Sequence, residues 1–181
     1  MKTLADIAQY VTDKVISEDI SLKNYITTDC LLPDKQGRVP ASNMPPQRCT
    51  LTKYAKGDVL VANIRPYLKK IWLADSGGGA SADVLVFRPK SGHSSQYLYA
   101  VLLQDSFYQW AMKGPKGSRM PRGDKNQIIR FPIIDLGAAE KAVGCLIDNL
   151  NKKIQLNKQI NRNLSGLDRS STAARFHRAD G

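Results

Sequence analysis

The 181-residue sequence has no long apolar run, few cysteines and little acidic charge, and each shortage excludes a class of protein. Apolar runs such as Val84–Phe87 fall far short of the roughly twenty residues that a membrane-spanning helix requires. Asp6 lies where a secretory signal would need its apolar core, so we expect a cytoplasmic protein. Cys30, Cys49 and Cys145 are too widely spaced to form a Cys-x-x-Cys pair, which is typical of free thiols in a reducing compartment.

Side chains for catalysis or metal binding are also scarce. The only glutamates are Glu18 and Glu140, and the two histidines, His93 and His177, lie far from any cysteine pair, so the spacing does not fit a zinc site. No Asp-x-Lys or Glu-x-Lys element of a metal-dependent nuclease occurs. The glycine-rich segment 77–83 lacks the Gly-Lys-Ser/Thr ending of a nucleotide-binding loop. The sequence therefore predicts no enzyme activity, no cofactor and no metal.

Positive charge, in contrast, is abundant. There are 27 lysines and arginines against 16 acidic residues, a formal net charge of +11, while the apolar content of 42% is that of a folded domain. Residues 30–136 carry sixteen basic and seven acidic side chains, whereas residues 1–29 are net acidic. This distribution indicates a polyanionic partner, most commonly nucleic acid. An anionic membrane surface is the alternative, but we find no strongly amphipathic basic helix with aromatic anchors.

Hydrophobic periodicity predicts an α+β domain with a mixed sheet over residues 1–137. Apolar residues at helical spacing indicate helices over residues 3–16 and 96–110. Apolar runs bounded by glycine, proline or aspartate indicate five strands, at residues 25–28, 59–64, 71–74, 84–87 and 128–134.

Residues 138–168 predict one long C-terminal helix. No proline interrupts them, and written as heptads they place six residues on one seam: Val143, Ile147, Leu150, Ile154, Asn157 and Leu164. Asparagine on an apolar seam is typical of coiled coils, where it sets register. Thirty helical residues span about 45 Å, more than packing on this domain requires, so we expect the helix to project and pair with another helix. The alternative is a helix folded back on its own domain. Residues 169–181 are expected to form a disordered tail.

Two basic segments are candidate DNA-binding elements. Residues 113–125 carry a positive charge at every third position, separated by glycines that allow backbone amides to approach a phosphate. Residues 63–70 are basic and aromatic, and arginine in either segment can bind phosphate or the edge of guanine. The alternatives are a solvated charged loop and a Tyr67 packed on the core. The predicted DNA-binding residues are Lys113, Lys116, Ser118, Arg119, Arg122, Lys125, Arg65, Tyr67 and Lys69.

Three motifs resemble the target recognition domain of type I restriction–modification specificity subunits. They are Gly57–Trp72, Ala80–Pro89 and Lys116–Lys125, in matching order and spacing, and the helix from Ala138 resembles the spacer helix that follows each recognition domain. The resemblance covers roughly residues 1–168. It implies that the chain binds double-stranded DNA without catalysing a reaction, and that its partners are methyltransferase subunits and, through them, restriction subunits.

One departure from the family concerns length. A specificity subunit of this family has two recognition domains and two spacer helices, whereas this sequence has one of each. The resemblance therefore implies either a half-subunit that forms a homodimer through its C-terminal helix and reads a bipartite site, or a fragment of a longer subunit. A non-specific basic nucleic-acid-binding protein and a stand-alone DNA-modifying enzyme remain the alternative functions.

Overall fold

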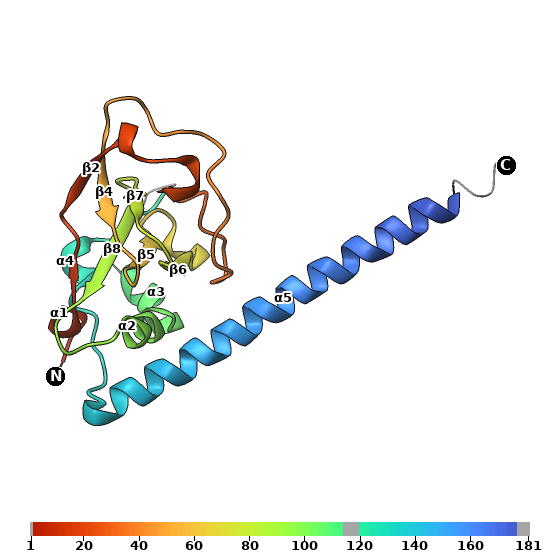
Figure 1. The fold of residues 1–181 in the computed structure, drawn as a ribbon. Helices are drawn as coiled ribbons and strands as arrows, with labels where there is room; N and C mark the ends of the chain where they lie inside the picture. The colour runs from red at the N-terminus through yellow and green to blue at the C-terminus, as the bar shows by residue number, and fades with distance from the viewer. Residues whose placement is uncertain (1, 114–119, 177–181) are drawn as a thin grey trace.

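Two central strands, β5 (Val59–Ala62) and β8 (Val84–Pro89), organise the fold in a computed structural model that describes residues 2–113 and 120–176 (Figure 1). They pair antiparallel, with Leu60 opposite Val86. Both are apolar along their length because successive side chains enter two different cores. Val59, Val61, Leu85 and Phe87 face one core, while Leu60, Ala62, Val84 and Val86 face the other.

The two central strands belong to the first of two four-stranded sheets. The first sheet is antiparallel throughout, in the order β1-β8-β5-β6, with β1 at Ala8–Tyr10 and β6 at Ile71–Leu73. The second sheet has the order β2-β4-β7-β3, and its β7–β3 pair is parallel. Its strands are β2 (Lys14–Ile16), β4 (Thr50–Tyr54), β7 (Gly78–Ala80) and β3 (Tyr25–Ile26).

Four short helices pack on the face of the first sheet that points away from the second sheet. They are α1 (Leu4–Ile7), α2 (Ser95–Leu102), α3 (Asp105–Ala111) and α4 (Lys125–Ile128). Their buried residues form the larger core with Phe87 and its neighbours on the sheet. The chain also contains the 3-10 turns η1 (Ser17–Asp19), η2 (Leu22–Asn24), η3 (Pro66–Leu68) and η4 (Gly137–Ala139). This arrangement confirms the predicted α+β class.

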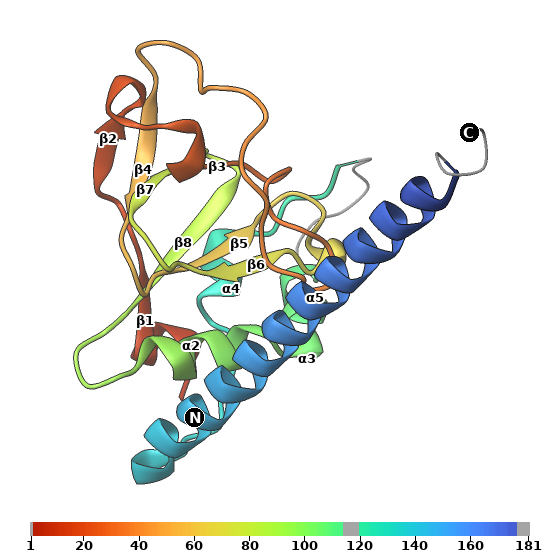
Figure 2. The ribbon, with the colours of Figure 1, turned by 45° about the vertical axis from the view of Figure 1, so that its right-hand side comes forward.

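The C-terminal helix α5 (Glu140–Phe176) begins against α2 and then extends well beyond the body (Figures 1 and 2). Its 37 residues correspond to a length of about 55 Å. The C-terminal segment is thus helical and continues past residue 168, where we expected the helix to end, while its pairing in a coiled coil stays a prediction. Gly144 permits the close approach to α2, because a Cβ atom there would lie 2.8 Å from the backbone nitrogen of Tyr97.

The predicted helix over residues 3–16 is largely wrong. Thr3 and Asp6 form the expected capping box, but the helix ends after one turn at Ile7. Residues 8–10 instead pair with β8, and the ring of Tyr10 lies 4.8 Å from that of Phe87. The strand pairing and this aromatic contact outweigh a weak helical preference in a short segment.

Two further elements differ from the sequence-based expectation. The helix predicted over residues 96–110 is divided, because Gln104 has an extended backbone and caps the second helix, α3. The strand predicted over residues 128–134 is absent from the structure, in which an isolated bridge joins Thr3 to Pro132. Phe131 and Ile133 are nevertheless buried, which explains the apolar pattern.

Candidate nucleic-acid interface

Three chain segments meet where β5 ends: residues 63–65, 81–83 and 120–123. Backbone hydrogen bonds hold them together, since Arg65 N donates to Pro121 O at 2.8 Å. The two basic segments identified in the sequence therefore lie side by side, although more than forty positions separate them in the chain.

The same junction is reinforced on both sides. Ile64 and Arg122 form an antiparallel bridge, Asn63 N donates to Asp83 O at 2.8 Å, and Gly123 N donates to Asn63 O at 3.2 Å. These bonds attach residues 120–123 to the segment that directly follows β5. Arg122 is thus held on ordered backbone, which is the requirement for a side chain that must meet a ligand in one geometry.

The side chains at this junction include the predicted DNA-binding residues Arg65, Tyr67 and Arg122. Arg65 is exposed and Tyr67 is 51% exposed, so Tyr67 is not a core residue. The Nε and Nη2 atoms of Arg122 each lie 3.1 Å from Oδ1 of Asp83. Asp83 was not among the predicted site residues, although it lies in the Ala80–Pro89 motif.

Two basic residues with left-handed backbone flank the turn η3. Arg65 has φ 51° and Lys69 has φ 50°, a conformation that residues other than glycine adopt rarely. Pro66 follows Arg65 directly and disfavours the right-handed helical conformation at Arg65. Surrounding hydrogen bonds are needed to maintain such conformations, which often occur at binding sites.

Lys69 differs from Arg65 because its charge is engaged within the protein. Its ammonium group lies 3.1 Å from Asp105 at the start of α3, and the ammonium of Lys35 contacts the same carboxylate. Hydrogen bonds from both lysines lower the pKa of Asp105. The cluster joins the loop around Lys35, η3 and α3, so Lys69 has a structural contact in addition to any role in DNA binding.

The remaining predicted DNA-binding residues are either exposed or outside the described part of the chain. Lys113 is exposed and its Nζ lies 4.9 Å from the ring centre of Trp110, while Lys125 is exposed at the start of α4. Three predicted residues lie outside the described residues: Lys116, Ser118 and Arg119.

Gly123 brings the basic segment close to the core. A Cβ atom at this position would lie 2.6 Å from Cδ1 of Ile128 and 3.0 Å from Oδ1 of Asn63. Asn63 is buried, and its Oδ1 has no hydrogen-bond partner within the described residues. A larger residue at this position would therefore have to displace the side chains of Ile128 and Asn63.

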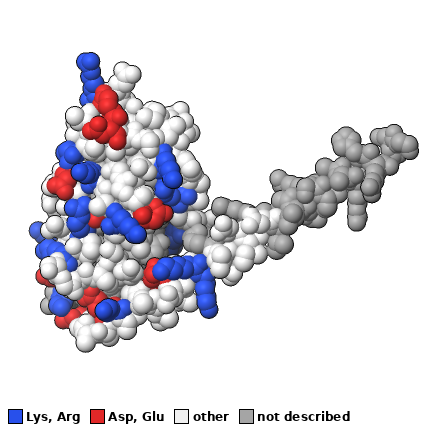
Figure 3. Space-filling view, viewed as in Figure 1, with Lys and Arg blue, Asp and Glu red and all other residues white. Residues whose placement is uncertain are grey.

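Charge on the body is mixed. Figure 3 shows lysine and arginine side chains interspersed with acidic ones over the face seen in Figure 1. Some of the positive charge is paired, as for Arg88, whose Nε and Nη2 contact the carboxylate of Asp58 at 2.8 and 2.7 Å. Net charge is therefore not enough to locate DNA contacts, which depend on the exposure and the ion-pair partners of individual side chains.

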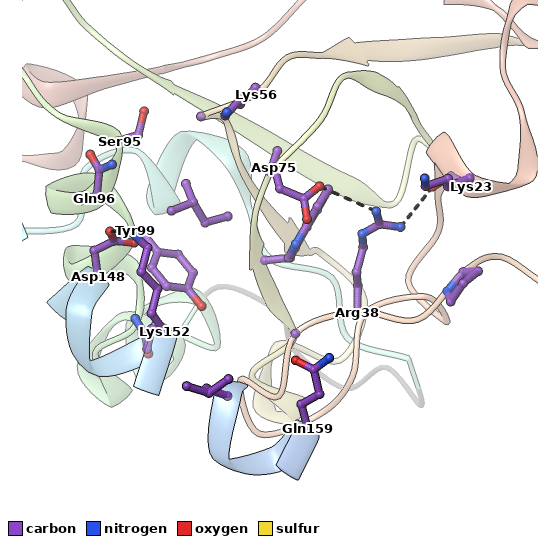
Figure 4. A pocket seen from close by; sticks show the side chains of 18 residues that line it. Lys23, Arg38, Lys56, Asp75, Ser95, Gln96, Tyr99, Asp148, Lys152 and Gln159 are labelled. Carbon is purple, nitrogen blue, oxygen red and sulfur yellow. Dashed lines mark hydrogen bonds and ion pairs between the residues drawn. The ribbon is translucent and has the colours of Figure 1, made fainter. Parts of the chain in front are cut away.

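A groove of about 960 Å³ separates the body from α5 (Figure 4). On the body side, the guanidinium of Arg38 lies 4.4 Å from the ring centre of Trp72 and 3.8 Å from Asp75. Tyr99 lines the groove near Asp148 of α5, and burial raises its pKa to about 12. The sequence did not reveal this groove, because its two walls are distant in the chain.

The predicted seam residues on α5 have different environments. Val143 and Ile147 are half-buried beside α2 and residues 132–136. Leu150 and Ile154 are each 49% exposed, and Asn157 is also exposed. The side chain of Leu164 lies outside the described part of the chain. The first turns of α5 thus fold back on the domain, while the later turns leave apolar side chains uncovered.

Within residues 2–113 and 120–176, no three His, Cys, Asp or Glu side chains lie together in a way that could hold a metal ion. Over the same residues, the structure contains no helix with the length and apolarity to cross a membrane.

Comparison with known proteins places the fold. No family model matches the chain, and no curated protein matches it. Among solved structures, the HsdS subunit from Thermoanaerobacter tengcongensis matches with a TM-score of 0.65 and 18% identity, over 90% of this chain and 44% of that one. A chain from a structure that addresses complex assembly and conformational transition of the type I R-M system matches with a TM-score of 0.62 and 17% identity, over 90% of this chain and 45% of that one. The chain therefore has the fold of somewhat less than half of an HsdS subunit.

Proposed function

We propose that this chain is a sequence-specific DNA-recognition subunit of a type I restriction–modification complex, in a half-length form. The observation that carries the proposal is the fold shared with the HsdS subunit over 90% of this chain but 44% of the other. HsdS is the specificity subunit of these systems, so one recognition domain and one spacer helix account for the length.

The proposed DNA-binding surface is the junction at the end of β5. Arg65 and Arg122 supply exposed guanidinium groups on ordered backbone, and Tyr67 adds an exposed ring. Lys113 and Lys125 lie at the two ends of the basic segment and are suited to phosphate contacts. Lys116, Ser118 and Arg119 belong to the same proposal on the basis of sequence alone.

The second half of a bipartite site would come from a second copy of the chain. The uncovered apolar side chains of α5, among them Leu150 and Ile154, are suited to pairing with another helix. An antiparallel pair would place a recognition domain at each end of an isologous dimer. Such a dimer reads an interrupted palindrome. The other faces of the helices are left to methyltransferase subunits, which would carry the chemistry and recruit restriction subunits.

Selection from random duplexes tests the proposal. The chain, bound to the methyltransferase subunit of its own system, is expected to enrich one bipartite sequence, and Arg65→Ala or Arg122→Ala should lower affinity for it by about 1–3 kcal/mol if the side chain contacts a base. Lys141→Ala, at the start of α5, is the matched control and should have little effect. Equal binding of all duplexes would instead indicate a non-specific basic protein.

The enzyme alternative has its own test. Incubation of the purified chain with DNA, Mg²⁺, ATP and S-adenosylmethionine is expected to yield neither cleaved nor methylated DNA. A product formed without partner subunits would contradict the proposal.

A further inference from the structure

Asp83 places a negative charge in the middle of the proposed DNA-binding surface. Its carboxylate meets Arg122 in a pair that is open to solvent, with the side chains 38% and 62% exposed. Exposed ion pairs contribute little to folding stability. A carboxylate also repels DNA phosphates and so weakens general affinity. Neither folding stability nor general affinity for DNA therefore explains why an acid occupies this position.

The geometry of the Asp83–Arg122 pair gives a reason for an acid at this position. Nε and Nη2 of Arg122 both point to one oxygen of Asp83, and among the described residues no other side chain accepts a hydrogen bond from this guanidinium. When the edge formed by Nε and Nη2 is bound to Asp83, the hydrogens of Nη1 and the second hydrogen of Nη2 can still donate to another acceptor. Two parallel donors of this kind match the O6 and N7 atoms of guanine.

The backbone on both sides of the pair is ordered. The carbonyl of Asp83 accepts a hydrogen bond from Asn63 N at the end of β5, and Arg122 forms a bridge with the neighbouring Ile64. Both partners are therefore attached to the same strand end. This differs from an ordinary surface pair, in which two long flexible side chains lose freedom to meet.

We propose that Asp83 is a positioning residue that fixes the guanidinium of Arg122 for reading a base and prevents it from binding phosphate. The inference rests on the proposed DNA recognition. Asp83 contributes to specificity in two ways: it orients the donor fork, and its charge disfavours any register in which a phosphate approaches Arg122.

The test compares two variants that remove the same charge. Asp83→Asn keeps the size and an oxygen acceptor but loses the negative charge, while Asp75→Asn makes the same change in the groove beside α5, where Asp75 pairs with Arg38. The measured quantity is the ratio of dissociation constants for random duplex and for the duplex that the wild-type assembly enriches. Thermal unfolding of each variant is recorded alongside.

We expect Asp83→Asn to reduce this ratio about tenfold, near the lower end for a bidentate arginine–guanine contact, with affinity for random duplex equal to or above that of the wild type. Asp75→Asn should keep the wild-type ratio. An unchanged ratio in Asp83→Asn overturns the inference. If the ratio is unchanged because affinity for both duplexes falls equally, the role of Asp83 is merely structural. If the wild type enriches no sequence, the proposed function itself fails and this inference fails with it.

Discussion

Asp58 lies in the Gly57–Trp72 motif that resembles the recognition domains, yet its environment is structural. Its side chain is only 3% exposed, and it accepts hydrogen bonds from Nε and Nη2 of Arg88 and from the backbone nitrogen of Ala55. The carboxylate thereby joins the turn before β5 to β8. A motif can therefore combine residues that maintain the fold, such as Asp58, with exposed residues that are proposed to bind DNA, such as Arg65.

This environment predicts a large effect of Asp58→Ala on stability. We expect a loss of about 3 kcal/mol in the free energy of unfolding, at the lower end for a broken buried pair because Arg88 keeps some access to water. Asp13→Ala is the matched control, since Asp13 meets the same guanidinium at 3.4 Å and is 64% exposed. That change should cost less than about 1 kcal/mol. Urea unfolding measures both, and equal losses would contradict the assignment.

Asp105 predicts a dependence of stability on pH. Its pKa is lowered from 3.8 by Lys35 and Lys69, so the cluster contributes its full stability above the unfolded pKa and loses it as pH falls through the folded value. Urea unfolding between about pH 2 and 7, a range that spans the carboxyl pKa values, should show Asp105→Asn less stable than wild type at neutral pH, with the gap closing in acid. Asp29→Asn, in an exposed loop, serves as control. A gap independent of pH would exclude the ion-pair explanation.

At the scale of elements, the contact between α5 and α2 depends on Gly144. Alanine favours a helix by about 1 kcal/mol over glycine, but its Cβ would meet the backbone of Tyr97, which cannot move as a side chain can. We expect Gly144→Ala to displace α5 and to lower the melting temperature. Cys145→Ala, at the adjacent exposed position, should leave it nearly unchanged. A more stable Gly144→Ala protein would show that helix propensity dominates and that the contact is loose.

Strands that consist of a continuous apolar run could be predicted from the sequence. The apolar runs of β5 and β8 are long enough to indicate strands buried on both faces, and α5 follows from thirty residues without proline. In contrast, β4 (Thr50–Tyr54) buries only Leu51 and Tyr54 among polar residues, which is a weak pattern in the sequence that did not indicate a strand. The short segment β1 has no signal of its own, because pairing with β8 determines it.

The candidate site was predictable in composition but not in geometry. Arg65 and Arg122 were selected because each lies in a basic segment, and the structure brings these segments together through the bridge from Ile64 to Arg122. No local pattern encodes such a bridge. Asp83 and Asp105 escaped notice for the same reason, since each gains its role only from basic residues distant in the chain.

At the scale of the whole molecule, the uncovered apolar side chains of α5 predict self-association. Leu150→Asp or Ile154→Asp should convert a dimer into a monomer, because each places a charge in the proposed helix pair. Leu156→Asp is the matched control, since Leu156 lies on the helix face that lines the groove toward the body. Light scattering at micromolar concentration measures the mass. A wild-type monomer, or a dimer unaffected by Leu150→Asp, would contradict pairing through α5.

The central claim is that this half-length chain confers sequence specificity on DNA binding. Selection of random duplexes by the wild-type chain, together with the methyltransferase subunit proposed as its partner, tests it most directly, at physiological salt, where non-specific phosphate contacts are weakened. The account predicts enrichment of one interrupted palindrome, two copies of a short half-site separated by a spacer of fixed length. A pool that remains random after repeated rounds, despite measurable binding, would contradict it.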